Sequence, residues 1–260
     1  MRRVRLLVVA AVLGAWVAGC GTGGGSPAAA PGVADGATTL TVFAAASLKN
    51  TFSTLGRSFE SAHPGTRVTF SFAGSADLAA QLQAGAPADV FAAADEKNMT
   101  KVTADQLVRG TPQVFATNRL EIAVPPDNPA GIASFADLAK PGVRLVTCAV
   151  EVPCGAATRE LQQAAGAALR PVSEESSVTD VLGKVQSGEA DAGLVYVTDV
   201  RAAGARVKGV AVPEARRAVN RYPIATLAKS RQPELAAEFV QLVTGAEGQQ
   251  VLGAAGFGRP

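Results

Sequence analysis

The chain has 260 residues, 48% of them hydrophobic, and its 24 basic and 22 acidic residues leave a net charge of +2. A chain of this size can bury a substantial core in one large or two small domains. The near-neutral charge balance and the aromatic content of only 5% argue against a nucleic-acid-binding surface, and the single histidine argues against histidine-based metal or acid–base chemistry.

The N-terminus has the pattern of an export signal. Basic MRRVR is followed by the apolar run LLVVAAVLGAWVA, which is short for a membrane span. The run leads into VAGC, which resembles the lipobox of bacterial lipoproteins, in which the cysteine is lipidated and becomes the first residue after cleavage. We therefore expect a signal peptide over residues 1–19, a lipidated Cys20, and a flexible Gly/Ala/Pro tether over residues 20–38. These features predict an exported protein held at the outer face of the cell membrane.

From Thr39 onward, short apolar runs alternate with amphipathic stretches. The apolar runs predict strands at 39–44, 67–72, 89–93, 113–117, 119–124, 143–147, 192–197 and 222–228. The amphipathic stretches predict helices at 47–61, 76–84, 95–104, 155–166, 178–187, 233–244 and 246–254. Strands that alternate with helices indicate an α/β fold with mixed sheets and helices on both faces.

Two long strand-like stretches, 113–124 and 220–229, predict that the chain leaves one α/β lobe for a second and later returns. The first lobe would comprise residues 40–118 and 222–260, and the second lobe residues 119–221. A single sheet with long strands is the alternative interpretation.

Four strand-to-helix junctions could together bind an anion, because helix N-termini carry unpaired N–H groups and a partial positive charge. The junction residues are Ser47, Ser75, Cys154 and Val178, and Tyr196 adds a hydroxyl at the end of an apolar strand. Each has a simpler explanation by itself: serine is a favoured N-cap residue, and a tyrosine is often a core aromatic. The functional interpretation depends on the set, since ligands of α/β sheets bind beyond the carboxyl ends of the strands.

Several segments resemble, in order, the extracytoplasmic molybdate-binding proteins of molybdate ABC transporters. The similar motifs, spread over residues 40–260, are VFAAASL (42–48), FAGSADLAAQLQAGAPADVFAAAD (72–95), VPCG (152–155), GLVYVTD (193–199) and RYPIA (221–225). The resemblance implies a two-lobed periplasmic-binding-protein fold of type II that closes on molybdate or tungstate. It also implies an ABC-transporter permease and ATPase as partners, no cofactor, no cation bound directly as a metal, and a monomer.

The resemblance also implies roles for the candidate residues. Ser47 and Ser75 match serines that donate through hydroxyl and backbone amide. Cys154 and Val178 match amide donors, and Tyr196 matches a hydroxyl donor. Cys154 departs from the family pattern, which usually has a small residue such as alanine there, but an amide donor tolerates a different side chain.

Two cysteines remain besides Cys20. An exported protein meets an oxidising compartment, so Cys148 and Cys154 are expected to form a disulfide, with two buried free thiols as the alternative.

Catalysis by a serine hydrolase is one alternative to binding, and a Ser–Lys pair is one form of it. Ser75 could be a nucleophile, but AGSAD lacks the second glycine of G-x-S-x-G, and the only histidine, His63, lies at the far end of the helix that starts near Ser47. We therefore expect a binding protein and no enzyme. Binding of another oxyanion such as sulfate, or of an organic anion, by the same fold is the nearer alternative, and an adhesion module without a ligand is a third.

Charged residues near the junctions are expected to play other parts. Lys49 is expected to be a solvated helix residue, and Glu151 is expected to point away from a bound dianion. The carboxylates of Asp77, Asp89 and Asp95 are expected to cap helices and hold loops.

Overall fold

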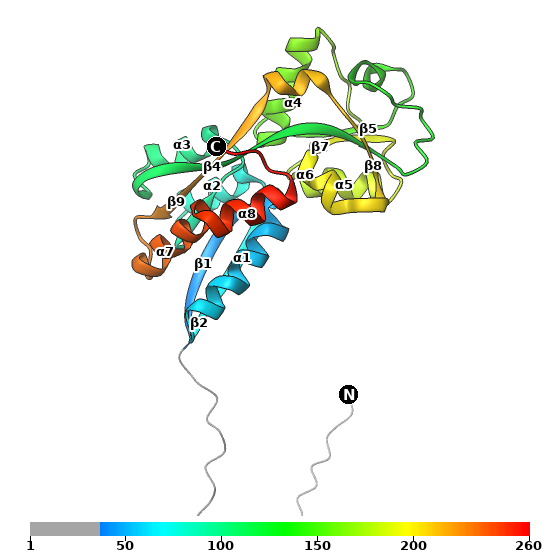
Figure 1. Ribbon diagram of the computed structural model, residues 1–260. Coiled ribbons are helices and arrows are strands. Elements are labelled where there is room, and N and C mark those ends of the chain that lie inside the picture. Colours follow the sequence, from blue (N-terminus) through cyan, green and yellow to red (C-terminus); the bar gives the residue numbers. More distant parts are fainter. Residues whose placement is uncertain (1–36) are drawn as a thin grey trace, which may run out of the picture. The chain divides into compact units, whose positions relative to one another are not determined.

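The computed structural model describes residues 37–260. The predicted signal peptide, Cys20 and the tether up to residue 36 lie outside the described residues, and Thr38, expected at the end of the tether, already belongs to the first strand. The strands are β1 (Thr38–Ala45), β2 (Thr66–Ala73), β3 (Val90–Ala92), β4 (Val108–Val124), β5 (Leu145–Cys148), β6 (Ser173–Glu175), β7 (Ala192–Tyr196), β8 (Lys208–Val210) and β9 (Val219–Leu227). The α-helices are α1 (Lys49–Ala62), α2 (Ser75–Gln83), α3 (Glu96–Ala104), α4 (Pro153–Ala165), α5 (Val178–Gln186), α6 (Val197–Ala203), α7 (Pro233–Thr244) and α8 (Ala246–Ala255) (Figure 1).

The expected mixed α/β architecture is confirmed, with three differences of detail. The two strands expected at 113–117 and 119–124 are parts of one 17-residue strand, β4. The helix expected from residue 47 begins as a 3-10 turn, η1 (Ala46–Leu48), before α1. Short elements such as β6, β8 and α6 were not predicted, because three to seven residues are too few to show a clear periodicity.

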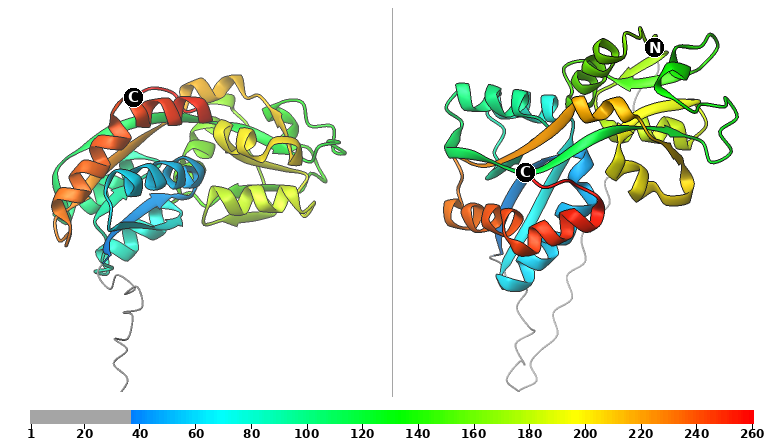
Figure 2. Two further views of the ribbon diagram at one scale, coloured as in Figure 1. Left: turned by 60° about the horizontal axis from the view of Figure 1, so that its bottom comes forward. Right: turned by 45° about the horizontal axis from the view of Figure 1, so that its top comes forward.

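The sheet is mixed and runs in the order β2-β1-β3-β9-β4-β7-β5-β6, with β8 also paired to β4. Parallel pairs join β1 to β2 and β3, and β5 to β6 and β7, whereas β4 is antiparallel to β9, β7 and β8. Strands β4 and β9 run side by side through the middle of the molecule, where Asn118 lies opposite Asn220 (Figure 2). The hydrogen-bonded ladder is therefore continuous through β4.

The buried apolar side chains form three clusters. One contains Leu40 and Val42 of β1 with residues of α1, α7 and α8, and the second contains Phe43 of β1 with residues of α2 and α3. Alternate residues of β1 thus face opposite sides of a sheet that has helices on both faces. The third cluster is drawn only from residues 120–218. For description, lobe I denotes residues 40–118 and 222–260, and lobe II denotes residues 119–221.

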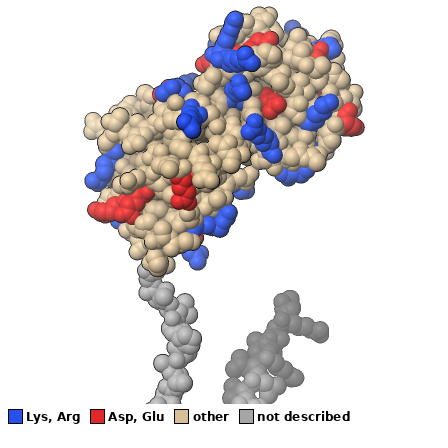
Figure 3. Space-filling view, in the orientation of Figure 1, with Lys and Arg blue, Asp and Glu red and all other residues tan. Residues whose placement is uncertain are grey.

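Within the described residues, no helix is long and apolar enough to cross a membrane, and no group of acidic, histidine and cysteine side chains could hold a metal ion. Basic and acidic side chains are both scattered over the face shown in Figure 3.

Candidate ligand-binding site

Ser47, Ser75, Cys154, Val178 and Tyr196 all line one small cavity, although they come from five separate parts of the chain. The cavity is small: the centre of a water molecule could occupy about 10 Å³ of it. The remaining lining residues are Ala45, Ala46, Ala73, Gly74, Ala94, Val152 and Pro153. The lining includes no charged side chain, so polar contact with a ligand depends on hydroxyl groups and on the backbone.

Helix starts from both lobes meet at this cavity. Ser75 is the first residue of α2 and follows β2 after Gly74 alone. In lobe II, Cys154 lies in the first turn of α4 after the helix-compatible Pro153, and Val178 is the first residue of α5. The N–H groups of a first turn have no partner within their own helix. The amides of these three residues are therefore available to an anion in the cavity.

Local sequence explains why the helices begin there. Ser177 is the N-cap of α5 and its Oγ accepts a hydrogen bond from the Asp180 amide at 3.3 Å, as the S-x-x-D pattern predicts. This side-chain cap occupies the amide of Asp180 and leaves the Val178 amide at the end of the helix.

Two serine hydroxyls are held by neighbours within lobe I. The Ala94 amide donates to Ser75 Oγ at 2.9 Å, so the hydroxyl proton of Ser75 remains available for donation to a ligand. Ser47 Oγ and the Tyr222 hydroxyl are 3.0 Å apart and share one hydrogen bond. Tyr222 is fully buried, and its ring packs edge-on against that of Tyr196 with centroids 6.0 Å apart.

The Tyr196 hydroxyl is the side-chain donor of the cavity that is most clearly available to a ligand. Its side chain is only 1% exposed, yet its hydroxyl has no hydrogen-bond partner among the described residues. Buried hydroxyls are normally hydrogen-bonded, because an unpaired polar group away from water is costly. Burial, with Tyr222 and nearby carboxylates, raises the pKa of this phenol well above its usual value, so it stays a proton donor.

Asp199 supports Tyr196 from the next turn. Its Oδ2 accepts a hydrogen bond from the Tyr196 amide at 2.9 Å, at the start of α6. Asp199 is 6% exposed, and this burial raises the pKa of its carboxyl from 3.8 to about 7. Asp199 is therefore about half protonated at neutral pH, which reduces the average negative charge next to the candidate site.

Cys148 and Cys154 form a disulfide, with their Cα atoms 5.7 Å apart. Both residues are 2% exposed. Cys148 ends β5 and Cys154 lies in the first turn of α4, so the bond closes the loop that leads to the α4 amides. The disulfide therefore restricts where the Cys154 amide can lie.

Asn118 and Asn220 connect the central strands to the residues around the cavity. Asn118 Nδ2 donates to Thr198 Oγ1 at 2.8 Å. Asn220 Nδ2 donates to the carbonyl oxygens of Ala94 in lobe I at 3.0 Å and Pro153 in lobe II at 3.4 Å. The point where β4 pairs with β9 is thus bonded to both walls of the cavity.

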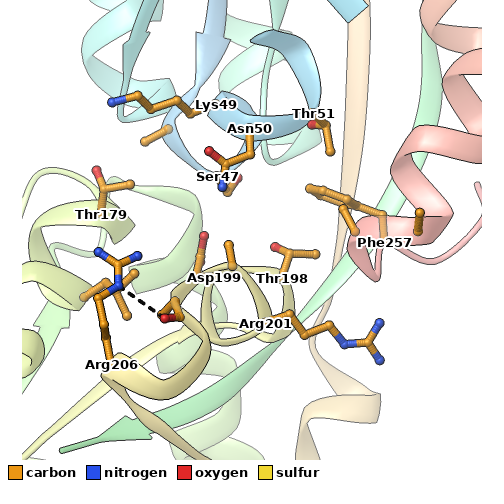
Figure 4. A pocket seen from close by; sticks show the side chains of 16 residues that line it. Ser47, Lys49, Asn50, Thr51, Thr179, Thr198, Asp199, Arg201, Arg206 and Phe257 are labelled. Carbon is orange, nitrogen blue, oxygen red and sulfur yellow. Dashed lines mark hydrogen bonds between the residues drawn. The ribbon is translucent and has the colours of Figure 1, made fainter. Parts of the chain in front are cut away.

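A larger cavity of about 340 Å³ adjoins the small one and shares Ala46 and Ser47 with it (Figure 4). Its charged lining residues are Lys49 from lobe I and Asp199, Arg201 and Arg206 from lobe II. Lys49 is exposed and lines this larger cavity, whereas it is not part of the small one.

The other charged residues near the junctions have structural partners or face solvent. Glu151 is exposed and is not among the residues that line the small cavity. Asp89 Oδ2 accepts from the Thr41 amide at 2.7 Å, and Asp95 is the N-cap of α3, so both hold backbone as expected. Asp77 is exposed in the first turn of α2.

Among the described residues, the only histidine is not positioned as a catalytic base for Ser75. His63 is the C-cap residue of α1, and its ring nitrogens bond the Phe59 carbonyl at 2.8 Å and Glu238 at 2.7 Å. The Ser75 hydroxyl instead bonds the Ala94 amide.

Three supporting residues of the site were not predicted. Tyr222 holds Ser47, Ala94 holds Ser75, and Asp199 holds the Tyr196 amide. Tyr222 lies in the motif RYPIA, Asp199 in GLVYVTD, and Ala94 in the long motif that contains Ser75. The motifs that carry the family resemblance therefore already included all three residues.

Comparison with known proteins shows the family to which the chain belongs. The family model described as bacterial extracellular solute-binding protein matches residues 40–258. The molybdate-binding protein ModA of Mycobacterium tuberculosis H37Rv is 49% identical over 254 residues, which cover 97% of each chain. The structure of the Azotobacter vinelandii periplasmic molybdate-binding protein superposes with a TM-score of 0.75 at 23% identity, covering 85% of this chain and 99% of that one. The sulfate-binding protein SubI of M. tuberculosis gives 0.70 at 21% identity, covering 85% and 86%. The chain belongs to the family of bacterial extracellular solute-binding proteins.

Proposed function

We propose that the protein binds molybdate, and tungstate in the same way, outside the cytoplasm and delivers it to an ABC transporter. The observation that carries the proposal is the buried Tyr196 hydroxyl, which has no hydrogen-bond partner in residues 37–260 and lines a cavity with Ser47, Ser75 and the helix starts at Cys154 and Val178. Such a site offers hydrogen-bond donors to a small anion. The 49% identity to a curated molybdate-binding protein supports molybdate as that anion.

Neutral donors are sufficient to hold a dianion. The amides and hydroxyls of Ser47 and Ser75, the amides of Cys154 and Val178, and the Tyr196 hydroxyl make about seven hydrogen bonds, each contributing roughly 1.5–3 kcal/mol to a charged ligand. The sum of roughly 10–20 kcal/mol exceeds the 8–12 kcal/mol or so of a micromolar to nanomolar Kd and leaves a margin for ordering and closure. No counter-charge is needed in the cavity.

The absence of a carboxylate from the lining also accounts for selectivity. A protonated oxyanion such as hydrogen phosphate would place its own O–H against a backbone N–H at the amide positions, leaving both donors unpaired. Sulfate has the charge and shape of molybdate with shorter bonds, so discrimination against sulfate depends on size. Sulfate is the main competing ligand, because a sulfate-binding protein shares this fold.

Binding proceeds by closure of lobe I on lobe II, with bending in β4 and β9 near Asn118 and Asn220. The antiparallel pair at these two residues supports this placement of the hinge, since it is where the chain passes between the lobes. Small-angle scattering with and without molybdate tests closure, and superimposable profiles would contradict it.

The lipobox-like VAGC supports attachment to the outer face of the cell membrane through a lipidated Cys20, with the following tether leaving the binding domain free to meet a permease and its ATPase. The protein acts as a monomer and performs no chemical reaction on its ligand. Loss of membrane association on Cys20→Ser, and light scattering of the soluble chain, test the anchor and the monomer.

Calorimetric titration of residues 21–260 with molybdate, tungstate, sulfate and phosphate tests the function directly. We expect one-to-one binding of molybdate and tungstate, with sulfate and phosphate weak or silent. Preferential sulfate binding would move the assignment to a sulfate-binding protein, and silence from all four anions would contradict an oxyanion function.

A further inference from the structure

The backbone conformation at Gly74 does not itself require glycine. Its φ of −59° and ψ of 140° lie in a region that any residue adopts. A Cβ built at Gly74 would nevertheless lie 2.0 Å from the backbone carbonyl oxygen of Ser176 and 3.6 Å from Val152 Cγ1. The first distance is far inside van der Waals contact, so this site excludes every side chain for steric reasons alone.

The contact joins the two lobes. Gly74 links β2 to α2 in lobe I, whereas Ser176 links β6 to α5 in lobe II. Both positions adjoin the small cavity, since Gly74 precedes Ser75 and Ser176 lies two residues before Val178. The obstructing atom is a backbone oxygen, which cannot rotate away as a flexible side chain would.

We infer that Gly74 determines how far the lobes close over the bound ion, and this inference rests on the proposed function. The absent Cβ lets the Gly74 backbone reach the Ser176 carbonyl, and this approach brings the donors of lobe II to an anion already held by Ser47 and Ser75. A methyl group at Gly74 would stop the lobes short of this contact, while each lobe by itself would be unaffected.

Gly74→Ala tests the inference, with Gly183→Ala as the matched control. Gly183 lies in α5 of lobe II, its φ is outside the left-handed region, and a Cβ there would meet no atom within 4 Å. Residues 21–260 of the wild type and of both variants would be compared by calorimetry and stopped-flow binding of molybdate. Scattering at saturating molybdate would report the degree of closure.

For Gly74→Ala we expect the Kd for molybdate to rise about 10- to 100-fold, the range that corresponds to typical overpacking costs. The change should lie in koff, with kon near the wild-type value, because encounter precedes closure. The molybdate-saturated variant should scatter as a more open molecule, and the thermal midpoint without ligand should not fall. Gly183→Ala should match the wild type in Kd, in koff and in scattering, and its thermal midpoint should be equal or slightly higher, because alanine favours a helix interior over glycine.

Four outcomes would overturn the inference. Wild-type affinity for Gly74→Ala would show that the contact does not limit closure. Weakened binding with a fully closed scattering profile would instead indicate a local displacement of Ser75. A lower thermal midpoint without ligand would place the clash in the fold rather than in closure. If the wild type itself bound no oxyanion, the proposed function would fail and this inference would fail with it.

Discussion

Replacing Tyr196 with phenylalanine should separate ligand binding from folding. The substitution removes one oxygen atom and keeps the ring, which packs against Tyr222 with centroids 6.0 Å apart. The removed hydroxyl has no hydrogen-bond partner among the described residues, so no bond within the protein is lost. A bond to the anion would be lost.

The magnitude follows from the charge of the ligand. A hydrogen bond to a charged group contributes roughly 1.5–3 kcal/mol, so the Kd for molybdate should rise about 10- to 150-fold. The free energy of unfolding without ligand should stay the same or rise by about 1 kcal/mol, because no internal hydrogen bond is lost and a buried, unpaired hydroxyl is removed.

Two measurements on the same preparation check this prediction: calorimetric titration with molybdate, and urea unfolding of the ligand-free protein. Tyr222→Phe serves as a comparison, because its hydroxyl does bond Ser47 at 3.0 Å and its loss should also affect the fold. Unchanged affinity in Tyr196→Phe, or a loss of stability above about 1 kcal/mol, would refute the assignment of this hydroxyl as a ligand donor.

Three further predictions concern groups around the cavity. Ser75→Ala should lower both affinity and stability, each by about 1 kcal/mol or more, because Ser75 Oγ also accepts from the Ala94 amide; loss of affinity alone would contradict this double role. Asp199 has a folded-state pKa of about 7 against 3.8, so the folded state binds more protons and the free energy of unfolding should fall as pH rises from about 4 to 7. In Asp199→Asn this contribution, at most about 4 kcal/mol, should vanish, which pH-dependent urea unfolding would detect; an unchanged slope would mean that Asp199 is not buried and protonated in solution. Replacing Cys148 and Cys154 together with alanine should cost about 2 kcal/mol of stability in the chain-entropy model, measured against the oxidised wild type, and equal stability would argue against the disulfide.

Much of this protein was readable from local sequence. The alternation of apolar and amphipathic stretches predicted most strands and helices, because burial on one face imposes a period on the chain. The capping pattern at Ser177 and the proline at position 153 marked helix starts, since caps satisfy amides a few residues away. The placement of Ser47 and Ser75 after apolar strands followed from the same local rules.

Only the tertiary structure determines which of these strands, helix starts and side chains lie together. Sequence cannot state that β4 is one strand of 17 residues, because strand length is set by the partners it finds, here β9 along one part and β7 along the next. It also cannot give the hydrogen bond between Ser47 and Tyr222, which are 175 residues apart, or the lack of a partner for the Tyr196 hydroxyl within the part of the chain that the structure describes. The steric limit at Gly74 depends on a carbonyl oxygen of the other lobe and has no local signature. Local sequence determined the helix ends and strands that could bind an anion, and long-range packing brought them to one cavity.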